Sequence, residues 1–220
     1  MYENNVLGEL MNPESADLIF EQVRPFMKLM TQYNCAMLEI KTKLEVLNMD
    51  LSMESDRNPF ESIQCRIKKP VSIAEKLKRR GYAINVENIE KYIHDVAGIR
   101  VICSFPDDIY KIADRLCSQD DVILVERKDY IANPKPNGYR SLHLILDIPI
   151  FLADETKHML VEVQFRTIAM DFWASLEHKV KYKNDIGGKA ERISAELKEC
   201  ADQISQMDMR MQQIREEIEK

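Results

Sequence analysis

The sequence lacks several features that would place it in familiar protein classes. No apolar run approaches the roughly 20 residues that a membrane-spanning helix needs. The first ten residues have neither the positive n-region nor the apolar stretch of a signal peptide. Neither GxxxxGKS nor GxxxxGKT occurs, so a P-loop kinase is not supported. We therefore expect a soluble cytoplasmic protein with no membrane partner.

Cysteine pairs and glycine are also scarce, and basic residues are outnumbered by acidic ones. The five cysteines, at positions 35, 65, 103, 117 and 200, form no CxxC pair and no even framework. Such usage fits reduced thiols better than a disulfide scaffold or a zinc site. The 31 basic residues are outnumbered by 37 acidic ones, and the net charge of −6 predicts no bulk attraction to nucleic acid. Only six glycines occur, which favours a high helix content.

What is present fits one domain with helical appendages, since 220 residues with 45% hydrophobic content are enough for a core. Residues 19–47 carry apolar side chains at steps of four and three, which predicts a long helix with Pro25 at a kink or in the first turn. A loop is predicted at 50–61. Residues 193–218 repeat the same steps as a heptad seam. That seam needs a partner, which is either the N-terminal helix or another subunit.

The clearest strand pattern lies at residues 159–167, MLVEVQFRT. Three apolar side chains alternate with three polar ones; the apolar set is Val161, Val163 and Phe165, and the polar set is Glu162, Gln164 and Arg166. This period of two predicts a strand with one buried face. The polar face by itself is explained equally well by solvent and by a functional site.

A basic segment between residues 66 and 80 holds seven cations and one acid. It starts in a short strand predicted at 63–67 and continues into a helix whose first turn suits Pro70. The last three cations of this helix fit a solvated C-terminus. The cations that can converge on a polyphosphate are those on the strand and the early turns, namely Arg66, Lys68 and Lys76.

A second carboxylate, Asp95, follows a helix predicted at 86–93. It lies at the mouth of a strand that continues to Phe105, and Gly98 is expected to let the backbone turn tightly there. The pair His94-Asp95 also occurs in metal-dependent HD phosphohydrolases. Their site needs histidines further upstream, and none precedes His94 here, so that interpretation is set aside.

The remaining pattern completes the predicted fold. A helix is expected at 106–118 and strands at 122–131 and 139–150, joined by a stiff loop with two prolines. Tyr139, which begins the second strand, suits either a structural cap or a ring that stacks on a base. The chain is therefore predicted to be α+β, with a mixed, roughly five-stranded sheet flanked by helices and long helices at both ends.

Three motifs and a helix occur in an order that resembles a known family. They are DVAGIR at 95–100, GYRSLH at 138–143, EVQFRT at 162–167 and AMDFWASLEHKVKYK at 169–183. The set resembles the synthetase domain of RelA/SpoT homologues, over about residues 59–183, and the absence of further domains resembles the small alarmone synthetases. The resemblance implies three parts: a nucleotidyltransferase-like catalytic domain at 59–184, a helical extension at 1–58, and a helix at 185–220 for oligomerisation or packing.

The resemblance also implies a reaction. Pyrophosphate would pass from ATP to the 3′-hydroxyl of GDP or GTP, with Mg²⁺ as cofactor, releasing AMP and making the stringent-response alarmones ppGpp or pppGpp. By similarity, Asp95 and Glu162 would be the catalytic residues and the Mg²⁺ ligands, and Glu162 would orient or deprotonate the hydroxyl. Two carboxylates suit this chemistry, because displacement at a highly charged phosphorus needs a metal and cations more than covalent help.

The same resemblance assigns other residues to two nucleotides. Those matching the ATP site are Arg66, Lys68, Ser72, Lys76 and Arg100, with the two arginines on adenine. Those matching the GDP or GTP site are Lys128, Lys135, Tyr139, Arg140, His143 and Gln164, with Tyr139 on guanine. The family further implies a homo-oligomer, commonly a tetramer, and regulation by an alarmone or single-stranded RNA.

Four residues depart from the family pattern at three places. Ser62 and Gln64 stand where some relatives bind a regulatory alarmone with an aromatic residue and a threonine. Asp171 stands where relatives can carry an asparagine, and His94 stands where glutamine is more usual.

Two other functions stay open at this point. One is a related toxin that pyrophosphorylates tRNA ends or makes adenosine alarmones, against which the acidic remainder of the chain argues. The other is a nucleotide- or RNA-binding regulator that has lost catalysis. The presence of Asp95, Glu162 and Tyr139 together argues against that regulator.

Overall fold

The computed structural model describes residues 13–54, 57–182 and 190–219. In chain order the elements are α2 (Pro13–Glu54), β1 (Phe60–Ile67), α3 (Pro70–Arg79), α4 (Val86–Tyr92), β2 (Ala97–Cys103), α5 (Pro106–Cys117), β3 (Ile123–Asp129), β4 (Leu142–Phe151), β5 (Thr156–Thr167), α6 (Ile168–Tyr182) and α7 (Ala190–Ile218). None of these described helices is long and apolar enough to cross a membrane.

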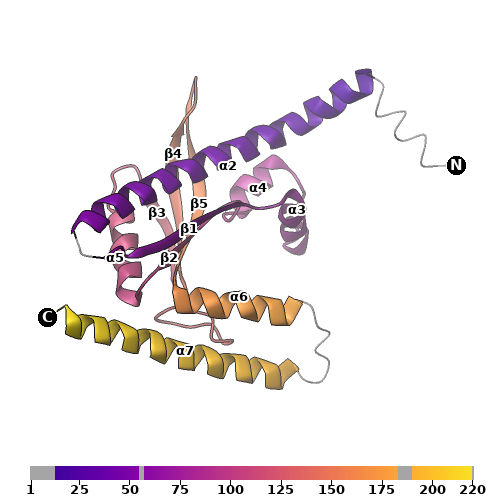
Figure 1. Ribbon diagram of the computed structural model, residues 1–220. Helices are drawn as coiled ribbons and strands as arrows, with labels where there is room; N and C mark the ends of the chain where they lie inside the picture. Colours follow the sequence, from indigo (N-terminus) through magenta and orange to yellow (C-terminus); the bar gives the residue numbers. More distant parts are fainter. Residues whose placement is uncertain (1–12, 55–56, 183–189, 220) are drawn as a thin grey trace.

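Strand β5 runs through the centre of a five-stranded sheet with the order β1-β2-β5-β4-β3. It pairs in parallel with β2 and antiparallel with β4, while β1 and β3 form the antiparallel edges. The sheet is therefore mixed, and the predicted α+β fold with five strands and long terminal helices is confirmed (Figure 1).

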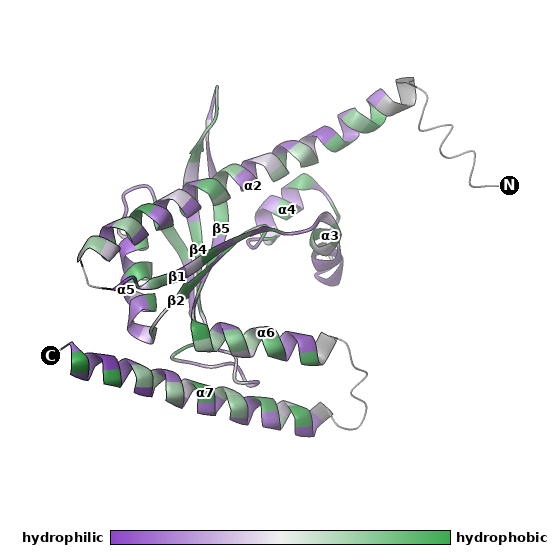
Figure 2. Ribbon diagram, viewed as in Figure 1, coloured by the Kyte–Doolittle hydropathy of each residue, from purple (hydrophilic) through white to green (hydrophobic). Residues whose placement is uncertain are grey.

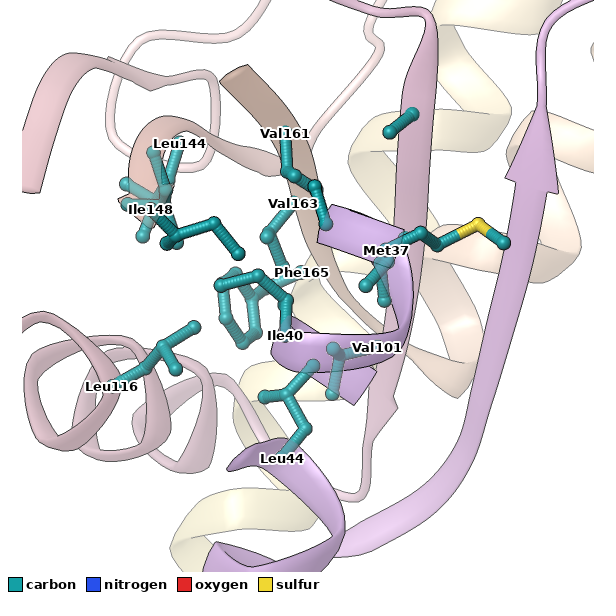
Figure 3. Close-up of a cluster of buried hydrophobic side chains, with 14 of the residues drawn as sticks. Met37, Ile40, Leu44, Val101, Leu116, Leu144, Ile148, Val161, Val163 and Phe165 are labelled. Carbon is teal, nitrogen blue, oxygen red and sulfur yellow. The ribbon is translucent and has the colours of Figure 1, made fainter. Parts of the chain in front are cut away.

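Helices α2 and α5 lie over one face of the sheet (Figure 1). The apolar side chains of β5 point into this layer, and Val161, Val163 and Phe165 are fully buried. They pack with a row of α2 residues that includes Ile40 and Leu44 (Figure 3). The alternation in β5 thus predicted its buried face correctly, and the polar face of the strand is turned the other way.

Helix α2 is longer than its apolar stripe predicted. It runs through Pro25 and continues to Glu54, because Leu51 extends the buried stripe by another turn. The loop predicted at 50–61 is therefore wrong at both ends, since β1 already starts at Phe60. The N-terminal end of α2 projects past the sheet, and Phe20 is exposed there (Figure 1).

Strand β4 begins at Leu142, three residues later than predicted. The preceding residues belong to a loop, in which Lys135 N donates to Tyr139 O and Tyr130 N donates to Ser141 O. Tyr139 therefore sits on a loop that its own backbone hydrogen bonds hold in place.

Helix α7 packs on α6 and α5, on the side of the molecule away from α2 (Figure 1). Its fold-back onto the N-terminal helix, one of the two options drawn from the sequence, is not the arrangement found. The residues of α7 that are buried are Ala201 and Asp208, whereas Met207 and Met211 of the predicted seam are exposed. Figure 2 shows hydrophobic and hydrophilic residues mixed along α7, and the helix turns a different edge to the body than the heptad predicted.

Asp208 is a buried carboxyl between α7 and the end of β5, with only 7% of its surface exposed. Its Oδ2 accepts a hydrogen bond of 2.6 Å from Thr167 Oγ1, which in turn accepts from Met170 N. Burial raises the pKa of Asp208, and the bond from Thr167 offsets this only in part.

Replacing Asp208 with asparagine is expected to raise the melting temperature at pH 7. The raised folded-state pKa means that folded protein holds a proton that unfolded protein has lost, so wild-type stability falls as pH rises from about 4 through that pKa. Asparagine keeps an oxygen for Thr167 and does not ionise. Melting curves from pH 4 to 8 check this, with the exposed Asp120→Asn as control. Parallel pH profiles for wild type and Asp208→Asn would contradict it.

Candidate active site

The strand register places polar side chains from distant segments in two rows across the open face of the sheet. In one row, backbone partners run Gln64, Arg100, Gln164, His143 and Lys128. In the neighbouring row they run Arg66, Gly98, Glu162 and Ile145. Because partners in adjacent strands project to the same side, most of the predicted site residues on strands share one face.

A cavity of about 330 Å³ opens over these rows. Its lining consists of Gln64, Cys65, Arg66, Lys68, Asp95, Gly98, Ile99, Arg100, Glu162 and Gln164. Gly98 lies between Arg66 and Glu162 in the row and has no side chain to fill the space between them. The tight turn expected at Gly98 is wrong, because this residue lies within strand β2 and is not among the glycines with positive φ.

Asp95 is held by two lysines at the wall of this cavity. Lys68 Nζ donates to its Oδ2 at 2.9 Å, and Lys76 Nζ lies 2.8 Å from its Oδ1. Burial by itself would raise the pKa of Asp95, but the bonds and charges of Lys76 and Lys68 outweigh it and hold the pKa below its usual range. Asp95 is therefore ionised at neutral pH, and two of the four cations predicted to bind ATP, Lys68 and Lys76, lie beside it.

Glu162 projects from the centre of β5 into the same cavity. Its Oε1 lies 3.3 Å from His143 Nδ1, and its Oε2 accepts from Gln164 Nε2 at 2.8 Å. Burial and the charge of Asp95 both act to raise the pKa of Glu162, yet the bonds from His143 and Gln164 keep it below the usual value. The two carboxylates predicted to act together are thus both ionised and close enough to influence each other.

Tyr139 lies next to Glu162, with His143 between them. An ionised carboxylate only accepts hydrogen bonds, so His143 Nδ1 is the donor to Glu162, and His143 Nε2 lies 2.8 Å from Tyr139 Oη. Tyr130 meets the Tyr139 ring edge to face at 6.0 Å, and Lys135 Nζ lies 4.8 Å from the ring centroid. The predicted guanine-stacking ring therefore stands beside the predicted base, although it does not line the cavity itself.

Arg166 joins the two halves of the site, although it was not among the site residues predicted from the sequence. It is 6% exposed, and it donates to Tyr139 Oη at 2.7 Å and to Asp171 Oδ1 at 2.9 Å. Arg100 Nη1 lies 3.3 Å from the same Asp171 oxygen. Burial and the charge of Arg166 lower the pKa of Arg100. The sequence pattern could have identified it, because Arg166 is the third polar residue, after Glu162 and Gln164, on the polar face of β5.

The predicted site residues that do not line the cavity are Ser72, Lys76, Lys128, Lys135, Tyr139, Arg140 and His143. Ser72 lies in the first turn of α3, and Lys128 is an exposed residue paired with Glu126 at 2.7 Å. Arg140 points to α7, where it donates to Ala201 O and to Asp202 Oδ1. Sequence spacing put Arg140 beside Tyr139 and His143, but neighbours on a loop need not point the same way.

The donor set fits a magnesium ion that is shared with a ligand. Asp95 and Glu162 supply two ionised oxygen ligands on one cavity, and Mg²⁺ is commonly held by one or two carboxylates together with phosphates and water. Among the described residues, no cluster of three or more His, Cys, Asp or Glu side chains could form a complete protein cage. Any such ion must therefore complete its coordination with substrate and solvent.

Comparison with known proteins gives consistent results. Residues 65–187 match the model of the region found in RelA/SpoT proteins. GTP pyrophosphokinase YwaC of Bacillus subtilis is 42% identical over 189 residues, which cover 85% of this chain and 89% of that protein. GTP pyrophosphokinase YjbM of the same organism is 36% identical, over 88% of this chain and 90% of that protein.

Solved structures of small alarmone synthetases have a similar fold. Small alarmone synthetase 2 from B. subtilis superposes with a TM-score of 0.78 at 40% identity, covering 87% of this chain and 98% of that one. Small alarmone synthetase 1 from B. subtilis, bound to its product pppGpp, superposes with a TM-score of 0.79 at 35% identity, covering 90% of this chain and all of that one.

Proposed function

The chain belongs to the RelA/SpoT family, among its small alarmone synthetases, and from this membership we propose that it is a GTP pyrophosphokinase that makes ppGpp or pppGpp from ATP and GDP or GTP. The observation that carries the proposal at the level of residues is the cavity itself. Two ionised carboxylates from separate elements, Asp95 and Glu162, line it together with Arg66, Lys68 and Arg100.

The proposed reaction is a single displacement at the β-phosphorus of ATP. The 3′-oxygen of the guanosine nucleotide forms a bond to the β-phosphorus of ATP, the bond between that phosphorus and the α,β-bridging oxygen breaks, and AMP leaves with the bridging oxygen. The 3′-hydroxyl proton passes to Glu162, which is ionised in the resting site and therefore able to accept it. The chain needs no covalent intermediate, because positioning and charge stabilisation carry most of such a transfer.

On the donor side, the cations stabilise negative charge on the polyphosphate. Lys68 and Lys76 are paired with Asp95, so they are held at the cavity wall before any nucleotide arrives. Arg66 and Arg100 lie in neighbouring rows of the sheet and supply planar guanidinium groups that stack on an adenine ring. Ser72, at the start of α3, is retained as a phosphate contact near a helix N-terminus.

On the acceptor side, Tyr139 supplies a ring for guanine. Its hydroxyl is tied to His143 and Arg166, so the ring is oriented before binding. Lys135 lies over the rings of Tyr130 and Tyr139 and is positioned for the phosphates of the nucleotide. Gln164 contacts Glu162 and lies next to the reacting hydroxyl.

Mg²⁺ is part of the proposal. Asp95 and Glu162 would hold it, and a bound ion would neutralise charge on the phosphates of ATP. Asp95 can bind Mg²⁺ only if the ion replaces at least one of its two lysine partners, because each of its oxygens has a lysine close by.

The direct test is to incubate purified protein with ATP, Mg²⁺ and GDP or GTP and to separate the nucleotides by ion-exchange chromatography. We expect AMP and a guanosine nucleotide with two more phosphates, in equal amounts. ³¹P spectra should place the added pyrophosphate on the 3′-oxygen. Release of free phosphate or ADP without the new guanosine product would contradict the proposal, and modification of added tRNA would favour the toxin alternative.

We propose that the chain works in the cytoplasm as a homo-oligomer, commonly a tetramer, and that an alarmone or single-stranded RNA regulates it. The exposed apolar residues on the projecting end of α2 and on α7 support assembly, among them Phe20, Met207 and Met211. Light scattering at micromolar protein concentration checks the assembly.

A further inference from the structure

The loop that carries Tyr139 is in close contact with helix α7. Gly138 has a φ of +87°, and a Cβ built on it would lie 2.6 Å from Ala201 Cβ and 3.3 Å from the Cα of Lys198. Two constraints therefore require glycine here, the left-handed backbone and the closeness of α7. No residue with a side chain fits at position 138 unless the helix or the loop moves.

Arg140 makes a second attachment two residues later. Its Nη1 donates to Gly138 O at 3.1 Å and to Ala201 O at 3.3 Å, and its Nη2 donates to Asp202 Oδ1 at 3.0 Å. The guanidinium thus binds its own loop and α7 at once. The Arg140 side chain is mostly shielded from solvent, whereas the Asp202 side chain is 42% exposed.

Tyr139 lies between these two attachments and points the other way. Gly138 and Arg140 face α7, while the ring of Tyr139 faces His143 and Arg166. Any shift of α7 relative to the sheet must therefore move both neighbours of the ring. Helix α7 therefore holds the loop on one side of the ring, and His143 and Arg166 hold the ring hydroxyl on the other.

Helix α7 is itself fixed to the catalytic domain at independent points. Trp173 Nε1 of α6 donates to Leu197 O at 2.9 Å, Thr167 donates to Asp208, and Arg215 pairs with Asp107 at 2.8 Å. These contacts come from α6, β5 and α5 in turn. The helix is therefore anchored along much of its length, as a support for a loop requires.

We propose that α7 is a brace for the acceptor-nucleotide site, and that the contact of Ala201 and Asp202 with Gly138 and Arg140 sets the affinity for the guanine nucleotide without touching it. This proposal rests on the proposed function, since it takes Tyr139 to be the guanine-binding ring. It assigns Arg140 a positioning role in place of the direct contact with GDP or GTP that the family resemblance implied. ATP binding lies on the other side of the cavity and should be insensitive to the brace.

The first experiment uses Ala201→Leu, which enlarges α7 where Gly138 approaches it. Calorimetry of the full-length protein with GDP, and separately with a non-hydrolysable ATP analogue and Mg²⁺, gives two dissociation constants. We expect the dissociation constant for GDP to rise at least about tenfold. The dissociation constant for the ATP analogue should stay within about twofold of the wild-type value. Ala195→Leu, the same change at an exposed position of α7, should alter neither. Equal weakening of both nucleotides, or no weakening of either, would overturn the proposal.

The second experiment separates positioning from direct contact. Arg140→Glu should weaken GDP binding under both interpretations, but only a brace allows rescue by Asp202→Arg on α7, because the swapped pair can form again. A double variant that binds GDP no better than Arg140→Glu alone would overturn the brace, even where Ala201→Leu fails to fold. Failure of the wild type to form product would count against the proposed function, whereas these binding ratios test the brace itself.

Discussion

Replacing Glu162 with glutamine is expected to lower kcat by about 10²–10⁴, the usual contribution of a positioned general base. The variant keeps the size of the side chain and loses its charge. An amide cannot take the 3′-hydroxyl proton, and it is a poor ligand for Mg²⁺. Its NH₂ group would also face one of the two donors that now bond to the carboxylate, His143 Nδ1 or Gln164 Nε2. Binding of ATP and GDP should persist, because the cations and the aromatic ring are untouched.

Initial rates of AMP release at saturating nucleotide, with dissociation constants measured in parallel, check this expectation. Glu155→Gln is the matched control, since it makes the same chemical change at an exposed carboxylate just before β5, which pairs with Lys28 at 3.4 Å. The control should keep wild-type kcat. Wild-type turnover in Glu162→Gln would show that another group accepts the proton.

The side-chain pattern of β5 could be predicted from the sequence because it is local. Alternation at 161–166 fixes which side chains share a face, and burial of Val161, Val163 and Phe165 confirms it. The pairing of Glu162 with Gly98 is not local. It depends on the parallel register of β2 and β5, which only the packed sheet sets. That register explains why a glycine, expected to serve a turn, instead leaves room within the cavity.

The position of α7 could not be predicted for a different reason. Its heptad pattern favoured an apolar seam, yet the edge that meets the body presents a small residue and a carboxyl, Ala201 and Asp208. Ala201 is there because Gly138 comes too close for a larger side chain, and Asp208 is satisfied by Thr167. Both reasons lie in segments distant along the chain. A rule that places apolar residues inside therefore selects the wrong edge.

Replacing Asp95 with asparagine is expected to separate nucleotide binding from metal binding. The variant loses one ionised ligand, and kcat/KM for ATP with Mg²⁺ should fall by at least about 100-fold, since even outer-shell changes at metal sites cost 10–100-fold. Affinity for ATP in excess EDTA should hold or rise. Lys68 and Lys76, which now neutralise Asp95, would be released to the phosphates, and a negative charge would be gone from the cavity.

Calorimetric titration of a non-hydrolysable ATP analogue, with and without Mg²⁺, measures both effects. In the wild type, Mg²⁺ should strengthen binding, because Asp95 then has a partner other than the two lysines; in Asp95→Asn that difference should vanish. Lys76→Met is the matched control, because it removes a cation from the same ion pair and should weaken ATP in both conditions. If Asp95→Asn kept the full Mg²⁺ effect, Asp95 would be a structural partner of the lysines alone, and the ion would depend on Glu162 and the phosphates.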